Sequence, residues 1–324
     1  MLIATLLLVG GLAILFGGGH YLVRGASAVA LLARISTAVV ALTVVAMGTS
    51  LPELAVSLDA AARESTDIAY GNIIGSCIFN VGAILGIVAV LRAVPVQRQT
   101  IWYEYPVMFV VACWALLLAR DGRVDRLEGA SLVIGLGLFI VYTVYLGRRG
   151  VTLTEAAALE RDVKRAAHLK EGARRAWGSN VVLVLLGIGA LALGAQLAVS
   201  GAVFIARALD VEERVIGLTI VAMGTSLPEL ATSIAAWRQR EPQIALGNIV
   251  GSNIFNLLAI LGITAAAFPV PVHPRAEAVD NWVMLGFTAL LFPLMLGGRR
   301  ISRGDGVLLL AGFVAYMAYV VVTG

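Results

Sequence analysis

Charged residues are scarce in this chain, at 14% of its 324 residues, whereas apolar residues make up 60% and the mean hydropathy is +0.92. This balance excludes an ordinary soluble globular domain and predicts an integral membrane protein. The net excess of four positive charges lies at the ends of apolar runs and forms no basic stripe. Membrane topology explains these charges, so we expect no nucleic-acid partner.

Cysteine is also rare, and a charged leader is missing. The two cysteines, Cys77 and Cys113, both lie inside apolar runs, so the sequence predicts neither a disulfide framework nor a metal cluster. The apolar run from Leu2 to Phe16 has no Lys or Arg before it. We therefore expect a retained first membrane span and not a cleaved signal peptide.

The apolar runs predict an all-α integral membrane protein with ten transmembrane helices. A helix needs roughly 20 apolar residues to cross the hydrocarbon core of a bilayer. On this measure the spans lie near residues 2–33, 36–62, 67–91, 100–119, 128–146, 178–206, 214–237, 243–268, 279–297 and 305–322. The first run is long enough for one tilted helix, or for two helices divided at the triplet Gly17-Gly18-Gly19.

One polar cassette occurs twice within these apolar runs. It reads Gly48-Thr-Ser-Leu-Pro-Glu53 with Gly71-Asn-Ile-Ile-Gly-Ser-Cys-Ile-Phe-Asn80, and again Gly224-Thr-Ser-Leu-Pro-Glu229 with Gly247-Asn-Ile-Val-Gly-Ser-Asn-Ile-Phe-Asn256. Both parts recur at an offset of 176 residues, and 29 of 45 positions are identical between residues 43–87 and 219–263. The chain is therefore an internal duplication.

Five spans in each copy is an odd number, so the second copy must enter the membrane from the opposite side. We expect two inverted five-helix repeats, residues 1–147 and 178–324, joined by a linker loop at residues 148–177. Loops on the side of the linker hold 16 Lys and Arg residues, and loops on the other side hold 7. The positive-inside rule then places the linker in the cytoplasm and both termini outside.

The linker carries many good helix formers, which predicts a short surface helix at residues 154–171. A solvated connection between the repeats explains the linker. A regulatory or lipid-binding segment is the alternative.

Glu53 and Glu229 lie in the middle of otherwise apolar segments, where an unpaired carboxylate costs about 2.5–3.5 kcal/mol. No Lys, Arg or His lies within the cassettes, so the compensating charge is either a proton or an external cation. Pro52 and Pro228 lack an N–H and free the carbonyls of Gly48 and Gly224, four residues earlier. We therefore expect broken helices with free carbonyls beside the carboxylates.

Polar side chains recur every fourth residue in each cassette, a spacing that places them on one face of a helix. The four stripes are Thr49, Glu53 and Ser57; Asn72, Ser76 and Asn80; Thr225, Glu229 and Ser233; and Asn248, Ser252 and Asn256. Gly71, Gly75, Gly247 and Gly251 are expected to let the helices approach closely. Oxygen ligands with two carboxylates suit Ca²⁺ or Na⁺ and argue against Zn²⁺ or copper.

These patterns leave other interpretations open. Hydrogen bonding between packed helices explains Asn72, Ser76 and their equivalents as well as ion binding does. The alternative for the two glutamates is a protonated, structural role.

The cassettes resemble the two alpha-repeats of the cation/calcium exchanger superfamily, specifically its prokaryotic sodium/calcium exchanger branch. The resemblance covers the two 45-residue segments directly, and the ten-span plan extends it to the whole chain. It implies an antiporter that exchanges Ca²⁺ against Na⁺ by alternating access in the plasma (inner) membrane of a bacterium or archaeon. It also implies an ion site with central carboxylates Glu53 and Glu229, hydroxyl ligands Thr49, Ser50, Thr225 and Ser226, backbone carbonyl ligands Ala46 and Ala222, and Ser76, Ser252 and Asn80 from the following spans.

One position departs from the resemblance. Some archaeal members and the potassium-dependent branch have Asp where this chain has Asn256, so two acidic residues are expected at the site and not three. Two carboxylates balance one Ca²⁺, two Na⁺ or two protons, whereas a third Na⁺ would leave a buried positive charge. The resemblance therefore does not directly imply that three Na⁺ are exchanged for each Ca²⁺. Asn256 is expected within ligand distance of the site.

The alternatives to Ca²⁺/Na⁺ exchange are Ca²⁺/H⁺ exchange, an intramembrane enzyme and a passive cation channel. The same glutamates would support Ca²⁺/H⁺ exchange by titrating. An intramembrane enzyme is not expected, because the spans offer no Ser/His pair, no HExxH motif and no second acidic group near either glutamate. A passive channel usually repeats by rotation around a pore, whereas inverted repeats with broken helices are typical of transporters. We expect no cofactor, Ca²⁺ and Na⁺ as substrates, the lipid bilayer as surroundings, and a monomer sufficient for transport.

Overall fold

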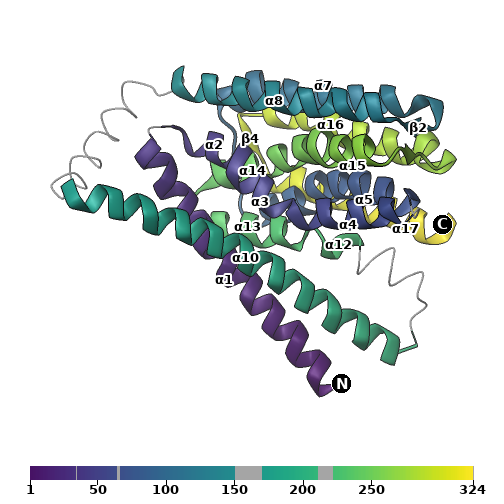
Figure 1. Cartoon of the computed structure of the whole chain (residues 1–324), viewed down its shortest axis with the longest axis horizontal. Coiled ribbons are helices and arrows are strands. Elements are labelled where there is room, and N and C mark those ends of the chain that lie inside the picture. The colour runs from purple at the N-terminus through teal and green to yellow at the C-terminus, as the bar shows by residue number, and fades with distance from the viewer. Residues whose placement is uncertain (34, 64–65, 150–169, 211–221, 324) are drawn as a thin grey trace.

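The computed structural model describes residues 1–33, 35–63, 66–149, 170–210 and 222–323. These residues are mostly helical (Figure 1), because a helix pairs its own backbone N–H and C=O groups and so tolerates an apolar medium. Eight helices are long and apolar enough to cross a membrane, and one bent helix pair is a ninth candidate. The all-helical membrane architecture is confirmed. The predicted span 214–237 begins outside the described residues, so the count of ten stays a prediction.

The first half begins with one unbroken helix, so the glycine triplet does not divide it. Its elements are α1 (Leu2–Ala33), α2 (Thr37–Val40), the π-helical turn η1 (Ala41–Val45), α3 (Ala46–Thr49), α4 (Leu51–Ala62), α5 (Thr66–Phe79), the π-helical turn η2 (Asn80–Leu85), α6 (Gly86–Leu91), β1 (Val94–Pro95), the π-helical turn η3 (Thr100–Glu104), α7 (Tyr105–Leu118), the 3-10 turn η4 (Ala119–Asp121), β2 (Arg123–Val124) and α8 (Arg126–Arg149).

The second half begins with a helix that starts earlier than the predicted sixth span. Its elements are α10 (Lys170–Ala208), α12 (Ala222–Gly224), α13 (Leu227–Arg238), α14 (Pro242–Phe255), the π-helical turn η6 (Asn256–Leu261), α15 (Gly262–Ala267), β3 (Val270–Pro271), the π-helical turn η7 (Ala276–Asp280), α16 (Asn281–Leu296), β4 (Arg300–Ile301) and α17 (Arg303–Thr323). The surface helix predicted at 154–171 lies almost entirely outside the described residues.

Helices α1 and α10 pack along each other and run diagonally to the other helices (Figure 1). Small residues make this contact possible, because a Cβ atom on Gly11 would lie 2.4 Å from the backbone nitrogen of Ala198. Membrane helices approach this closely only where side chains are minimal. Most buried apolar side chains of this pair form a second cluster, which also includes Val40, Val45 and Ala231, whereas Val23 of α1 belongs to the larger core.

Two short antiparallel strand pairs connect loops that are far apart in the sequence. β1 pairs with β4, so that Val94 lies opposite Ile301, and β2 pairs with β3, so that Val124 lies opposite Val270. Each pair joins two loops for which the basic-residue count predicts the same side of the membrane. The two ends of the chain lie toward the side of β2 (Figure 1).

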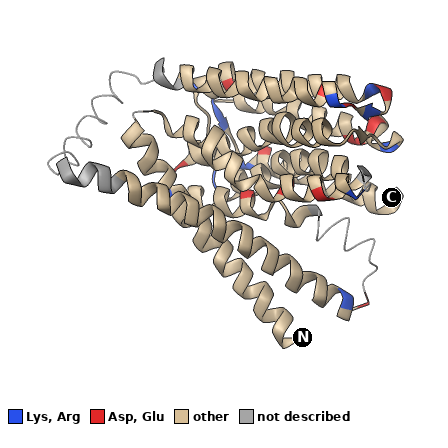
Figure 2. Cartoon of the chain, viewed as in Figure 1, with Lys and Arg blue, Asp and Glu red and all other residues tan. Residues whose placement is uncertain are grey.

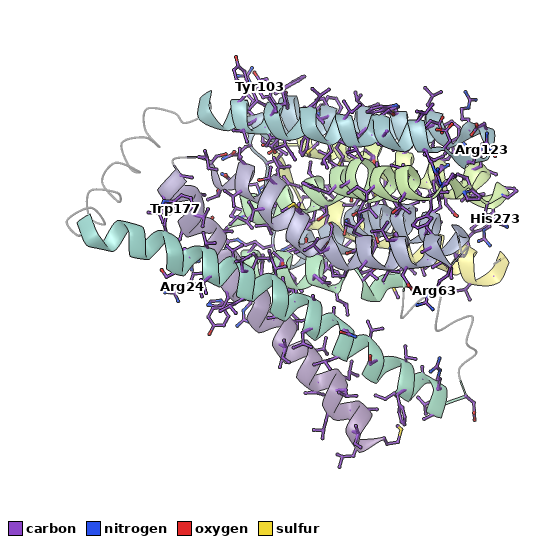
Figure 3. All side chains as sticks on the ribbon, in the orientation of Figure 1. Arg24, Arg63, Tyr103, Arg123, Trp177 and His273 are labelled. Atoms are coloured by element: carbon purple, nitrogen blue, oxygen red, sulfur yellow. The ribbon has the colours of Figure 1, made fainter. Side chains whose placement is uncertain are left out.

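Charged residues gather toward the ends of the helices and leave most of their length uncharged (Figure 2). Arg63, Arg123 and His273 lie at one end of the molecule, whereas Tyr103 and Trp177 lie toward the other (Figure 3). The arrangement fits helices that cross a bilayer, because charges avoid the hydrocarbon core.

Candidate functional site

The first polar cassette lies at a break between α3 and α4. The two helices meet at Ser50, which has φ −87° and ψ 5°, and the helical segment Thr37–Thr49, which ends with α3, is bent by 43° relative to α4. Pro52 stands in the first turn of α4, where its missing N–H costs no helical hydrogen bond. The proline therefore ends one helix and begins the next, as predicted. Glu53 follows in that first turn, where the helix dipole favours negative charge.

The second cassette has the same local geometry. Ser226 has φ −91° and ψ 8° and caps α13, with Pro228 and Glu229 in the first turn. Two positions 176 residues apart thus share one backbone conformation. The shared conformation indicates that the Ser-Leu-Pro-Glu sequence itself determines the break.

Each glutamate accepts a hydrogen bond from a serine of the other copy. Ser226 Oγ donates to Glu53 Oε1 at 3.0 Å, and Ser50 Oγ donates to Glu229 Oε1 at 2.9 Å. The two glutamates are 1% and 0% exposed. Their Oε2 atoms have no hydrogen-bond partner within the described residues. Each carboxylate is therefore held through one oxygen, while the other is available to a ligand.

The neighbouring threonines pair across the two copies in the same way. Thr225 Oγ1 donates to Asn72 Oδ1 at 3.1 Å, and Thr49 Oγ1 lies 3.3 Å from Asn248 Oδ1. These reciprocal contacts join the two broken helices to the helices that follow the glutamates in the opposite copy. The polar stripes predicted from the sequence thus meet at one place between the copies.

The two remaining serine candidates differ in their contacts. Ser252 Oγ donates to Glu229 Oε1 at 3.3 Å, whereas Ser76 Oγ lies 3.1 Å from Ser226 Oγ. Ser76 therefore reaches its glutamate, Glu53, only through Ser226. The two copies therefore supply equivalent residues to the site, but the contacts of Ser76 and Ser252 differ.

Asn80 and Asn256 each begin a π-helical turn, a feature often found at functional sites. Asn80 Nδ2 donates to Asn253 Oδ1 at 3.0 Å, which leaves Asn80 Oδ1 without a partner among the described residues. Neither amide atom of Asn256 has a hydrogen-bond partner there. Both asparagines are buried, so their unpaired oxygens are available to a cation.

Asn253 is a polar site residue that the sequence analysis missed. Its Nδ2 donates to the Cys77 carbonyl at 3.3 Å while its Oδ1 orients Asn80. Its equivalent in the first copy is Cys77, 176 residues earlier. That mismatch within an otherwise similar block was the signal that could have identified it.

The structure shows the contacts of one predicted carbonyl ligand, Ala46, and less of the other, Ala222. The Ala46 carbonyl accepts a hydrogen bond from Ser50 N at 3.0 Å and lies 3.2 Å from Thr49 Oγ1, so a cation bound to this carbonyl would take the place of the Thr49 hydroxyl. Ala222 begins α12, but its side chain lies outside the described residues.

The close approach predicted for the cassette glycines is found in the second copy. A Cβ atom on Gly247 would meet Ala41 at 2.9 Å, and one on Gly251 would meet Ala46 at 2.8 Å. A Cβ atom on Gly71 or Gly75 would meet no atom of the described residues within 4 Å, and the residues equivalent to Ala41 and Leu42, at positions 217 and 218, lie outside the described part of the chain.

No basic side chain balances the two glutamates in the described part of the chain, where the one ion pair joins Arg63 to Asp59 at the exposed end of α4. Two buried carboxylates without counter-charge are costly, so the site is built to take up positive charge. The described residues contain no group of three or more His, Cys, Asp or Glu that could hold a metal ion. Hydroxyl, amide and backbone oxygens would therefore have to complete the coordination of a cation.

The sequence pattern of one family, described as "Sodium/calcium exchanger protein", matches this chain twice, at residues 3–147 and at residues 179–322. The chain belongs to the sodium/calcium exchanger protein family. The two matches together cover most of the chain, and each contains one polar cassette.

This exchanger-family chain also has full-length relatives. It is 39% identical over 323 residues to CaxA of Alkalimonas amylolytica, covering 98% of each chain. It is 36% identical to the inner membrane protein YrbG of Escherichia coli strain K12, covering 98% of this chain and 97% of YrbG. It is 31% identical to the sodium/calcium exchanger MaX1 of Methanosarcina acetivorans, covering 96% and 97%.

Solved structures of a sodium-calcium exchanger, NCX_Mj, have a similar fold. The structure soaked with 10 mM Na⁺ and zero Ca²⁺ matches with a TM-score of 0.83 and 31% identity, covering 98% of both chains. The structure soaked with 2.5 mM Na⁺ and 0.1 mM Ca²⁺ matches with a TM-score of 0.82. The fold therefore agrees with the family to which the chain belongs.

Proposed function

We propose that this member of the sodium/calcium exchanger family is a secondary active antiporter that moves Ca²⁺ against Na⁺ by alternating access. One observation carries the proposal. Glu53 and Glu229 are buried on two broken helices, each holds one oxygen without a protein partner, and no described basic residue neutralises them. The relatives MaX1 and NCX_Mj are named as sodium/calcium exchangers, which supports these two ions as substrates.

The proposed ligands are the residues predicted from the sequence. Glu53 and Glu229 bind the ion through Oε2, and the other ligands are Thr49, Ser50, Ser76, Asn80, Thr225, Ser226, Ser252, Asn256 and the carbonyls of Ala46 and Ala222. Two ionised carboxylates match one Ca²⁺ or two Na⁺ in charge. One Ca²⁺ and two Na⁺ therefore compete for the same site. Without a bound ion the two buried negative charges oppose the change between the inward-facing and outward-facing states. This competition is the physical basis proposed for exchange.

We further propose ten spans in two inverted repeats, residues 1–147 and 178–324, in a multi-pass protein of the plasma (inner) membrane. The separate family match to each half and the equal geometry at Ser50 and Ser226 support the repeats. The linker 148–177 would be cytoplasmic and both termini external. The proposed ligands of both copies lie together within one chain, and we propose that a monomer suffices for transport.

Cysteine labelling tests the topology. Single cysteines introduced at Ser179 and at Arg123 should react from opposite sides of the membrane, because the basic-residue count places residue 179 inside and residue 123 outside. A membrane-impermeant maleimide applied to intact cells should label Arg123→Cys and leave Ser179→Cys unlabelled until the cells are opened. The matched background is a chain with Cys77 and Cys113 replaced by Ala. Labelling of both positions from one side would refute the inverted arrangement.

Ca²⁺/H⁺ exchange is the second candidate, favoured by one observation: buried glutamates without basic partners can also be neutralised by protons. Proteoliposomes separate the two functions. Ca²⁺ uptake should follow an outward Na⁺ gradient at equal pH and disappear when an ionophore collapses that gradient. A matched K⁺ gradient is the control. Uptake driven by a pH gradient alone, with no response to Na⁺, would reject Na⁺ coupling and establish the proton-coupled alternative.

A further inference from the structure

A second candidate site lies away from the glutamates, at the end of the molecule that contains β1 and β4. There a cavity of about 330 Å³ opens between the end of α6, β1, the end of α13, the start of α14 and β4. We call it the arginine cavity. It is lined by Val88, Arg92, Ala93, Val94, Pro95, Trp237, Arg240, Pro242, Ala245 and Arg300.

Three arginines from three separate loops reach this cavity, and the fold brings them together. Arg300 lies opposite Pro95 in the β1–β4 pair, and Val96 N donates to the Arg299 carbonyl at 2.8 Å. The β1–β4 pair thereby holds the loop of Arg92 beside the loop of Arg300. Arg240 joins them from the end of α13, where it has φ 62°. A left-handed conformation is unusual for a residue other than Gly, Asn or Asp.

The three guanidinium groups have no acidic partner in the described part of the chain. The one ion pair there, between Arg63 and Asp59, involves none of them, and the adjacent carboxylate of Glu241 lies beyond ion-pair distance of Arg240. Three positive charges around one cavity repel one another unless an anion lies between them. The positive charge of these three arginines therefore favours binding of an anion in the cavity.

The other lining residues specify what kind of anion fits. Seven of the ten are apolar or proline. Guanidinium groups are donors only, so a ligand among the three arginines must supply several acceptor oxygens. Arginine matches phosphate oxygens in a planar, two-point geometry. The apolar walls suit a phosphate that is joined to an apolar group.

We propose that the arginine cavity binds the phosphate of an anionic phospholipid headgroup. The position of the cavity favours a lipid over a free ion, because it lies where α6 and α13 end, at the level at which membrane-spanning helices meet headgroups. The basic-residue count places these loops on the cytoplasmic side, whose anionic lipids attract basic residues. A bound lipid would bridge α6, α13, α14 and the two strands, and it should therefore stabilise the folded protein.

Lipid binding to the purified full-length chain tests this proposal without any transport measurement. Native mass spectrometry and thermal unfolding in a neutral detergent are measured with added phosphatidylglycerol, phosphatidylcholine or inorganic phosphate. Phosphatidylglycerol should bind and raise the unfolding temperature, and phosphatidylcholine should do so far less. Stabilisation by inorganic phosphate equal to that by phosphatidylglycerol would overturn the lipid assignment.

The matched variants remove the same number of charges at opposite ends of the molecule. Replacing Arg92, Arg240 and Arg300 with Gln should weaken phosphatidylglycerol binding roughly 100-fold, because each arginine near an anionic headgroup contributes roughly fivefold. Replacing Arg120, Arg123 and Arg126 with Gln should change binding by less than about twofold, since β2 lies toward the opposite end of the molecule from β4 (Figure 1). Equal binding by both variants would overturn the proposal. Should the first variant not fold, Arg300→Gln alone should lose roughly fivefold.

Discussion

Replacing Glu53 or Glu229 with Gln is expected to reduce Na⁺-driven Ca²⁺ uptake by at least about 100-fold, equivalent to about 2.7 kcal/mol. Each change removes one of the two charges that balance Ca²⁺, and it places an amide N–H where a cation would meet Oε2. Uptake into proteoliposomes under an outward Na⁺ gradient measures the effect. The serine contacts of Glu53 and Glu229 explain why both are needed, since each carboxylate is oriented by the other copy.

The folded state should survive both substitutions. A neutral amide costs less to bury than an unpaired carboxylate, so the unfolding temperature without Ca²⁺ should stay equal or rise. Saturating Ca²⁺ should stabilise the wild-type chain by about 2.7 kcal/mol at one hundred times Kd, and this shift should disappear in both variants.

Asp59→Asn is the matched control for the loss of a carboxylate on the same helix. The Asp59 side chain is 62% exposed and pairs with Arg63, one turn from the end of α4. Its replacement should leave Ca²⁺ uptake within about twofold of wild type, because an exposed ion pair contributes little. Wild-type transport by Glu53→Gln or Glu229→Gln would show that the central carboxylates have been assigned wrongly.

Asn256→Asp is expected to change the ion coupling ratio, by raising the number of Na⁺ ions or adding a proton for each Ca²⁺ moved. The reason is electrostatic: a site of low dielectric tolerates little net charge, so the cation load should follow the number of ionised carboxylates. Asn256 suits the test because its amide makes no hydrogen bond with the described residues, and the substitution therefore breaks none of them. Reversal potentials of proteoliposomes measure the ratio.

Asn80→Asp is the comparison from the first copy. It should shift the coupling in the same direction, but it also replaces the Nδ2 donor to Asn253 Oδ1 with an acceptor oxygen. We therefore expect a lower unfolding temperature for Asn80→Asp than for Asn256→Asp, by a few degrees. An unchanged coupling ratio in Asn256→Asp, with unchanged activity and pH dependence, would mean that Asn256 serves packing and is not an ion ligand.

The local features of the site could be predicted from the sequence because their causes are local. Pro52 and Pro228 cannot donate a helical hydrogen bond, and one helix ends and another begins beside each of them. The polar stripes follow from the repeat of a helix, and the burial of Glu53 and Glu229 follows from their apolar neighbours along the chain. Hydropathy likewise predicted α1 and the other long helices, with the start of α10 as the main error in the boundaries.

Partners across the two copies could not be predicted in this way. The hydrogen bond from Ser226 to Glu53 joins residues 173 positions apart, and Asn253 became a site residue only because packing places it against Asn80. The π-helical turns at Asn80 and Asn256 also carry no local signal that distinguishes them from ordinary helix.

The sequence by itself determined that the chain lies in a membrane, that it is duplicated, where its helices break and that Glu53 and Glu229 are buried. Hydropathy and the backbone chemistry of proline act within a few residues along the chain. The duplication follows from the sequence identity between the two halves. The tertiary structure decided which hydroxyl orients each carboxylate, which oxygens stay unpaired, and that Arg92, Arg240 and Arg300 surround one cavity. Those properties depend on how helices that are far apart in the sequence pack together. The distances between their side chains cannot be predicted from residue spacing along the chain.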